Sequence, residues 1–302
     1  MTLFDLKQKP IPFQILVFLI IWFFSMLIFV LSGPIVAQLI SGVDPATAMK
    51  DLDNITTAGI SSMKWYQFMS QIFIYGIPPV LFAAFHGPSI VGFFNDNRSS
   101  SSTAKYNAGS LTLVGVGLMI FLLGIGGVIK QIDLGSEAQA LQQRREAMEG
   151  ILLKMDSIPS MIINVLLIGF VPAICEELFF RGFVQQYLSK LIPNKGILPV
   201  IITAILFASV HGSIYNFAPI IIAGTVLGLV YYWTKDIKAN TVVHLINNGL
   251  QVILIYFVGH NSQLTSMMES STAAYISSII GAVLLCVGMK LIYNTHSKFK
   301  SI

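Results

Sequence analysis

Apolar runs recur from one end of the sequence to the other, and they constrain the fold more than any other feature. A helix needs about 20 mostly apolar residues to cross a bilayer. Charged residues make up only 11% of the 302 residues, against about 25% in soluble domains. The sequence therefore predicts an all-α, polytopic membrane bundle of about eight transmembrane helices. The expected spans are residues 11–39, 65–85, 111–129, 161–183, 197–213, 217–233, 239–258 and 273–293.

The distribution of basic residues predicts how the chain threads the membrane. With the N-terminus in the cytoplasm, the inside segments carry eleven Lys or Arg residues and three acidic residues. The outside segments then carry six Lys or Arg residues and nine acidic residues. The positive-inside rule therefore places both termini in the cytoplasm, in a multi-pass protein of the plasma (inner) membrane. No nucleic-acid partner is expected, because the basic residues cluster at span ends.

An amphipathic helix is expected over residues 133–156, between the third and fourth spans. Its apolar residues recur at helical spacing and its charged residues fill the other face, which is typical of a helix lying in the membrane interface. A simple joiner between two spans is favoured over a role in guiding substrate. The apolar positions are Leu141, Met148, Ile151 and Leu152, and the charged ones are Arg144, Arg145, Glu146 and Glu149.

Three ionisable residues interrupt the fourth apolar run. Glu176, Glu177 and Arg181 lie within six residues, and each charge costs about 2.5–3.5 kcal/mol at the centre of a membrane helix. Glu177 and Arg181 are four residues apart on one helical face, with the acid first, as in a favourable ion pair. Glu176 points about 100° away from Glu177. We therefore expect Glu177 and Arg181 to form a structural pair and Glu176 to be free for chemistry.

Two further spans carry polar residues. The fifth contains His211, with Phe207 one turn earlier and placed to pack beside the imidazole. The seventh contains His244 and Asn248, four residues apart, so that both can aim donors at one point; Asn247 is the competing amide. Each cluster alone also fits polar contacts between helices.

The three clusters together indicate a reaction centre. A buried glutamate beside a histidine can activate water as a general base. A histidine and an asparagine that project together can stabilise an oxyanion, an effect of about 3–4 kcal/mol per donor in acyl-transfer sites. Convergence of these groups in one cavity predicts hydrolysis of an amide bond.

The order of the motifs resembles a known family. Glu-Glu-x-x-x-Arg, Phe-x-x-x-His and His-x-x-x-Asn on separate spans resemble the CPBP intramembrane endopeptidases, which include CAAX prenyl endopeptidases and the bacterial Abi-type bacteriocin-processing and immunity proteins. The resemblance covers about residues 160–250. The expected division is therefore N-terminal spans with the amphipathic joiner (1–159), a catalytic helix core (160–260) and a C-terminal span (261–302).

The resemblance implies a role for each matched residue. Glu176, assisted by His211, would activate the water, and His244 and Asn248 would stabilise the tetrahedral intermediate. Glu177 and Arg181 would hold the helices in register. Counted from the cytoplasmic helix ends, Glu176 and His211 lie about 16–21 Å deep and His244 about 8–12 Å deep.

No metal or other cofactor is expected, although zinc stays an alternative. The sequence has no His-Glu-x-x-His motif, and a zinc site made of Glu176, His211 and His244 would leave the water without a separate base. The expected partners are the lipid bilayer and a peptide or membrane-protein substrate.

Two other functions also fit buried Glu and His side chains. Buried Glu and His side chains also serve proton relays in transporters, although related halves would then be expected and the polar clusters fall only in the second half of the chain. The other alternative is a non-catalytic immunity or binding scaffold that retains the pocket.

Overall fold

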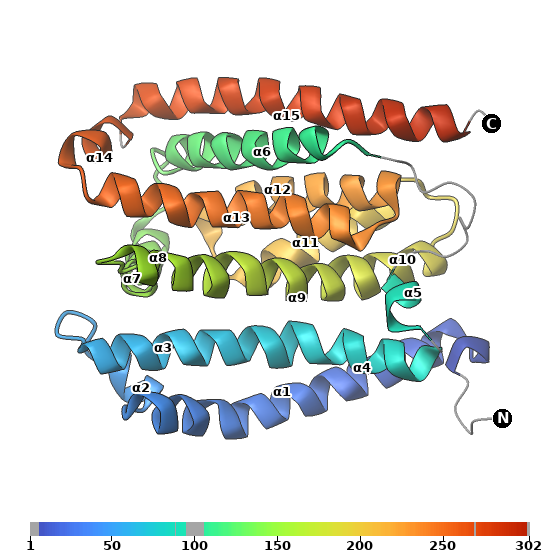
Figure 1. Cartoon of the computed structure of the whole chain (residues 1–302), viewed down its shortest axis with the longest axis horizontal. Coiled ribbons are helices and arrows are strands. Elements are labelled where there is room, and N and C mark those ends of the chain that lie inside the picture. The colour runs from blue at the N-terminus through green and yellow to red at the C-terminus, as the bar shows by residue number, and fades with distance from the viewer. Residues whose placement is uncertain (1–5, 88, 95–105, 269, 301–302) are drawn as a thin grey trace.

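The structure, a computed structural model, describes residues 6–87, 89–94, 106–268 and 270–300. Every regular element in these ranges is a helix (Figure 1). Within the same ranges, seven helices are long and apolar enough to cross a membrane. They span Ile11–Ser41, Thr57–His86, Ala108–Ile129, Ile158–Leu191, Ile214–Thr234, Ile237–Gly259 and Ser271–Ser297. The all-α membrane bundle expected from the sequence is thus confirmed.

The expected span 197–213 is the exception. It forms α11 (Leu198–His211), a helix of 14 residues. At about 1.5 Å per residue this helix is roughly 21 Å long, which is shorter than a hydrocarbon core of about 30 Å. Gly212 ends it in the left-handed conformation (φ 61°), and the Ser213 side chain caps the next helix. The described residues therefore contain seven helices of full spanning length, and α11 is too short to be an eighth.

Several spans are built from consecutive helical segments. The second comprises α3 (Thr57–Ser70), η2 (Gln71–Gly76) and α4 (Ile77–His86). The fourth comprises α8 (Ile158–Asn164), η4 (Val165–Phe170), α9 (Val171–Phe179), η5 (Phe180–Gln185) and α10 (Gln186–Leu191). The other elements are η1 (Leu6–Gln8), α1 (Ile11–Ser41), α2 (Pro45–Ala48), α5 (Ile90–Phe94), α6 (Ala108–Ile129), α7 (Ser136–Leu152), α12 (Ile214–Thr234), α13 (Ile237–Gly259), α14 (Ser262–Met268) and α15 (Ser271–Lys300).

Prolines explain two of the wide helical turns. Proline lacks the N–H of a helical hydrogen bond and crowds the preceding turn. Pro78 and Pro79 lie in the first turn of α4, which follows the π-helical turn η2, and Pro172 is the second residue of α9, which follows η4. A π-helical turn widens the helix at such a point without ending it. The fourth span therefore stays continuous up to the glutamates that follow Pro172.

The helices lie in layers (Figure 1). The pair formed by α1 and α3–α4 covers one side, α9 and α13 run through the middle, and α6 with α15 covers the other side. The amphipathic stretch forms α7, at the end of the bundle opposite the start of α1. Helix α1 begins and α15 ends at the same end of the bundle. The start of α1 and the end of α15 thus lie on one side of the bundle, and the assignment of this side to the cytoplasm remains a prediction.

The outer helices expose their apolar side chains. Phe23 and Leu31 on α1 are 54% and 65% exposed, and Ile279 on α15 is 66% exposed. Apolar surface of this extent is unfavourable in water and favourable against lipid. The chain is therefore an integral membrane protein, with α1 and α15 facing the hydrocarbon.

Gly224 and Gly228 let α12 approach α11 closely. A Cβ at Gly224 would lie 3.0 Å from the Ala204 Cα, and one at Gly228 would lie 2.6 Å from a Val200 side-chain carbon. Small residues at such points allow close packing in membranes. The two glycines also leave their backbone carbonyls accessible to side chains of η5.

The close contact between α6 and α15 leads to a stability prediction. A Cβ at Gly124 would lie 2.3 Å from the Ser278 backbone nitrogen, whereas a Cβ at Gly126 on the same helix would have nothing within 4 Å. Gly124→Ala should therefore lower the free energy of unfolding by about 1–3 kcal/mol through overpacking. Gly126→Ala is the matched control, expected to be neutral or slightly stabilising. Equal melting temperatures of the two variants in detergent would contradict the contact.

Candidate functional site

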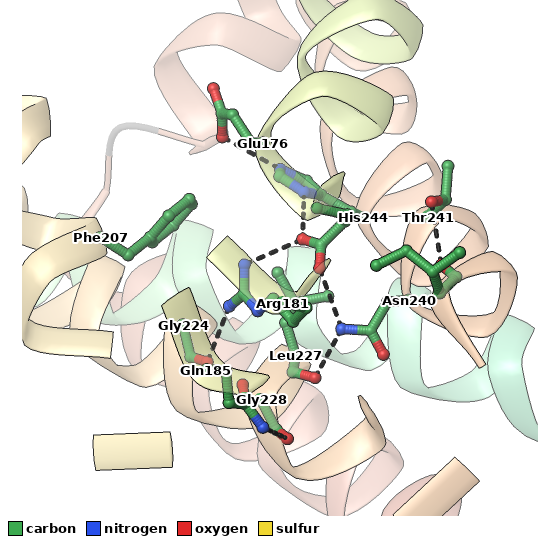
Figure 2. Close-up of polar contacts among 12 residues, drawn as sticks. Glu176, Arg181, Gln185, Phe207, Gly224, Leu227, Gly228, Asn240, Thr241 and His244 are labelled. Carbon is green, nitrogen blue, oxygen red and sulfur yellow. Dashed lines mark hydrogen bonds and ion pairs between the residues drawn. The ribbon is translucent and has the colours of Figure 1, made fainter. Parts of the chain in front are cut away.

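The centre of the bundle holds a buried ion pair. Arg181 Nη1 donates to Glu177 Oε1 at 3.0 Å, and both side chains are 0% exposed. Arg181 Nη2 donates to the backbone oxygen of Gly224 at 2.9 Å, and Gln185 Nε2 donates to that of Gly228 at 2.9 Å. Arg181 therefore joins its own helix to α12 at the point where the missing Cβ exposes the carbonyl (Figure 2).

Glu177 has more partners than the ion pair expected from the sequence. Its Oε1 also lies 2.8 Å from His244 Nδ1, and its Oε2 accepts from Asn240 Nδ2 at 3.0 Å. The Asn240 amide donates in addition to the backbone oxygen of Leu227. One carboxylate thus connects the fourth span to α13. A buried carboxylate needs this many donors to offset the loss of water.

Asn240 was not among the residues singled out from the sequence. It lies four residues before His244 on α13 and is fully buried. The same helical spacing that linked His244 to Asn248, applied toward the N-terminus, points to Asn240.

His244 lies between the two glutamates. Its Nε2 is 3.9 Å from Glu176 Oε2, while its Nδ1 contacts Glu177 (Figure 2). An ionised carboxylate only accepts hydrogen bonds, so the contact with Glu177 places a hydrogen on Nδ1 and fixes the ring orientation. Nε2 therefore faces Glu176. At 3.9 Å the two groups are too far apart for a direct hydrogen bond and close enough to contact the same small reactant.

His211 and Phe207 lie at the C-terminal end of α11. His211 Nδ1 contacts the backbone oxygen of Phe207 at 2.6 Å, which places the hydrogen on Nδ1 and leaves Nε2 as the acceptor of the neutral ring. The Phe207 ring lies 4.6 Å from the His211 ring and 6.2 Å from the His244 ring. Among the described residues, no hydrogen bond joins His211 to Glu176. The Phe207 ring therefore lies near both imidazole rings, those of His211 and His244.

Asn247 and Asn248 contact each other. Asn247 Nδ2 donates to Asn248 Oδ1 at 2.8 Å. In the described part of the chain, the Asn248 Nδ2 group makes no hydrogen bond, so this amide keeps its donors for another group. Asn247 is the more buried of the two. Within the described residues, neither the Asn247 nor the Asn248 side chain forms a hydrogen bond with His244.

The three alternative zinc ligands do not lie close enough together to hold a metal ion. A metal ion needs about three protein ligands within roughly 2.0–2.3 Å. Over the ranges described above, no group of three His, Cys, Asp or Glu side chains could hold a metal ion. Glu176, His211 and His244 therefore do not fit a zinc site in this arrangement.

Helix α7 contacts the same region from the end of the bundle. Its Glu146 pairs with Lys130, which follows α6, at 2.6 Å, and accepts a hydrogen bond from Gln142 at 3.1 Å. Its Arg145 donates from Nε to Glu149 and from Nη1 to the backbone oxygen of His211. The joiner helix is thus attached both to α6 and to α11.

The Glu146 contact predicts a response to acid. The hydrogen bond from Lys130 lowers the pKa of Glu146 below its ordinary value of 4.5; burial opposes this shift, and Gln142 adds to it. A lowered folded-state pKa means that the carboxylate stabilises the folded form above about pH 4.5, and that this contribution is lost as the pH falls through the lowered pKa. The protection factors of α7 amides, which compare their exchange with the intrinsic rate at the same pH, should therefore be constant from about pH 8 to 5 and should fall in stronger acid. Glu146→Gln should remove this acid-dependent loss of protection; an unchanged acid response in that variant would contradict the assignment.

Known proteins resemble the part of the chain that carries this site. Residues 158–250 match the family described as type II CAAX prenyl endopeptidase Rce1-like. A protein of Staphylococcus aureus (strain USA300), described as the membrane-embedded CAAX protease MroQ, is 29% identical over 141 residues, which are 45% of this chain and 53% of that protein. The chain thus matches about half the length of this relative. No solved structure matches it significantly.

These matches show what the segment carrying the site is similar to. Residues 158–250, which contain the buried Glu-His cluster, are similar to the Rce1-like CAAX prenyl endopeptidase family. The relative from Staphylococcus aureus is described as a membrane-embedded protease.

Proposed function

We propose that this protein is an intramembrane endopeptidase that hydrolyses a peptide bond with water activated by a glutamate. The observation that carries the proposal is the pair formed by Glu176 and His244. Their side chains lie 3.9 Å apart inside the bundle, and Glu177 holds the imidazole in one orientation. A base and a donor that face one point are the arrangement that acyl transfer to water requires.

In the proposed reaction, Glu176 acts first as the base. Its carboxylate accepts a proton from water while the water oxygen attacks the peptide carbonyl carbon. The carbonyl oxygen becomes an oxyanion and accepts a hydrogen bond from His244 Nε2, whose imidazolium form also donates from Nδ1 to Glu177. When the C–N bond breaks, the protonated Glu176 donates its proton to the departing amine. Glu176 thereby returns to its carboxylate form.

His211 and Asn248 complete the proposed site. Neutral His211 has an acceptor at Nε2, which suits it to hold the attacking water for Glu176. Asn248 uses its oxygen to accept from Asn247 and keeps its amide hydrogens for the oxyanion. Phe207 packs against both imidazoles and limits their rotation. We propose these roles on side-chain chemistry, since neither residue contacts Glu176 directly in the described part of the chain.

The proposed substrate is a peptide attached to the membrane, either as a lipidated peptide or as part of a membrane protein. The description of the matching family supports a prenylated peptide, and the buried position of Glu176 and His244 supports delivery from the bilayer. We place the cleavage near the cytoplasmic side of the plasma (inner) membrane, in line with the distribution of basic residues.

Purified protein in liposomes should cleave such peptides. A quenched fluorescent peptide would be tested with and without a prenyl group, and mass spectrometry would locate the cleaved bond. Incorporation of oxygen-18 from labelled water into the new carboxylate would demonstrate hydrolysis. Proton-coupled uptake of the peptide into the same liposomes, without any cleavage, would overturn the proposal in favour of a transporter.

A further inference from the structure

Arg145 connects the surface helix α7 to the end of α11. Its guanidinium donates from Nη1 to the backbone oxygen of His211 and from Nε to Glu149 at 2.7 Å. The Arg145 side chain is 31% exposed, so most of it is covered. Arg144, the preceding residue, is exposed and makes no such contact among the described residues. Two adjacent arginines on one helix thus have different surroundings.

The carbonyl that Arg145 binds lies at the C-terminal end of α11. The last carbonyls of a helix have no partner within the helix, and a cation there also interacts favourably with the helix dipole. His211 is the last residue of α11, and Gly212 then turns the chain. Because the His211 ring contacts the carbonyl of Phe207 one turn earlier, the ring is fixed to its own helix. The placement of the helix end therefore decides where Nε2 lies.

Helix α7 has further contacts with α6 and with the start of α12. Glu146 pairs with Lys130 at the end of α6, and Gln142 contacts both Glu146 and the Ser213 hydroxyl. Ser213 caps α12 and directly follows the turn at Gly212. Helix α7 thus holds the α11–α12 turn at two points three residues apart on its own surface, through Gln142 and Arg145.

We propose that Arg145 is a positioning residue of the peptidase, which fixes the end of α11 so that His211 faces the reacting water. This inference rests on the proposed function and extends the site to a helix outside the matched family segment. Helix α7 is then part of the active site's support, beyond its role as a joiner between two spans.

Kinetics of Arg145 variants in liposomes test the inference. A displacement of about 1 Å in a catalytic group can cost about 100-fold in rate, so Arg145→Ala should lower kcat by roughly 10- to 100-fold with little change in KM. Arg145→Lys, which keeps a cationic donor, should recover part of the loss. Arg144→Ala is the matched control and should stay within about twofold of the parent protein. Equal rates of Arg145→Ala and Arg144→Ala would overturn the inference.

A double-mutant cycle separates positioning from general destabilisation. In single-turnover assays with excess enzyme, Arg145→Ala should cause no further loss once His211 is replaced by alanine, because the two residues act as one unit. An equal fold loss in both backgrounds would show that Arg145 acts independently of His211 and would overturn the inference. If Arg145→Ala does not fold, Glu149→Ala, which removes the partner of Arg145 Nε, replaces it in the cycle. Absence of any Glu176-dependent cleavage by the parent protein would instead contradict the proposed function itself.

Discussion

Glu176→Gln should abolish peptide cleavage while leaving the fold intact. General-base catalysis contributes about 10²- to 10⁴-fold to a rate, and the amide of glutamine cannot accept the proton of water. The side chains have nearly the same shape. In addition, the Glu176 side chain makes no hydrogen bond among the described residues, and its contact with His244 spans 3.9 Å. We therefore expect a loss of at least about 10²-fold in kcat, measured with the quenched peptide in liposomes.

The control for this experiment is Glu137→Gln. Glu137 lies exposed in the first turn of α7, so the same chemical change there should leave kcat within about twofold. Melting temperatures of both variants in detergent should match that of the parent protein. Cleavage by Glu176→Gln at a comparable rate would remove Glu176 from the mechanism and leave His244 and His211 as the candidates for the base.

The pairing of Glu177 with Arg181 was predictable because it depends on local helical geometry. Residues four apart on a helix share a face whatever surrounds them. The additional partners of Glu177, His244 and Asn240, come from another helix. Which turns of α9 and α13 face each other depends on packing across the bundle, and helical spacing within one span carries no information about it.

The depth of His244 shows where counting along helices fails. Counting predicted that His244 lies about 8 Å shallower than Glu176, yet the two side chains are 3.9 Å apart. From Glu176 the helix continues for 15 residues to Leu191, whereas only seven residues separate His244 from the start of α13 at Ile237. The end of α10 therefore extends past the start of α13 (Figure 1). The rise per residue gives relative depth only when helix ends are level.

The short helix α11 has a similar explanation. Residues 197–213 are apolar enough for a span, and composition alone cannot show that the helix ends inside the bundle. The end is set by Gly212 in the left-handed conformation and by the Ser213 cap. This early end brings His211 to the terminus of a helix, where Arg145 of α7 can reach its carbonyl.

Glu177→Ala should destabilise the protein more than any surface substitution. The change leaves Arg181, which is 0% exposed, without its charged partner, and removal of one member of a buried pair costs about 3–5 kcal/mol. Reversible unfolding in mixed micelles would measure the difference. Glu149→Ala is the matched control: it breaks another Arg-Glu pair at four-residue spacing, but with side chains 31% and 45% exposed, so its cost should stay below about 1 kcal/mol.

A double variant then separates the structural role of Glu177 from its role in the site. Glu177→Leu combined with Arg181→Met replaces both charges by apolar side chains of similar size, which is often neutral or stabilising in a buried pair. Part of the lost stability should therefore return, while His244 Nδ1 and the Gly224 carbonyl stay without these partners. Cleavage should not return, because His244 Nδ1 still lacks the carboxylate that orients the ring, and the loss of such an orienting group costs roughly 10²- to 10⁴-fold in rate. A stable and fully active double variant would show that Glu177 serves packing alone, and that the orientation of His244 depends on other contacts of α13.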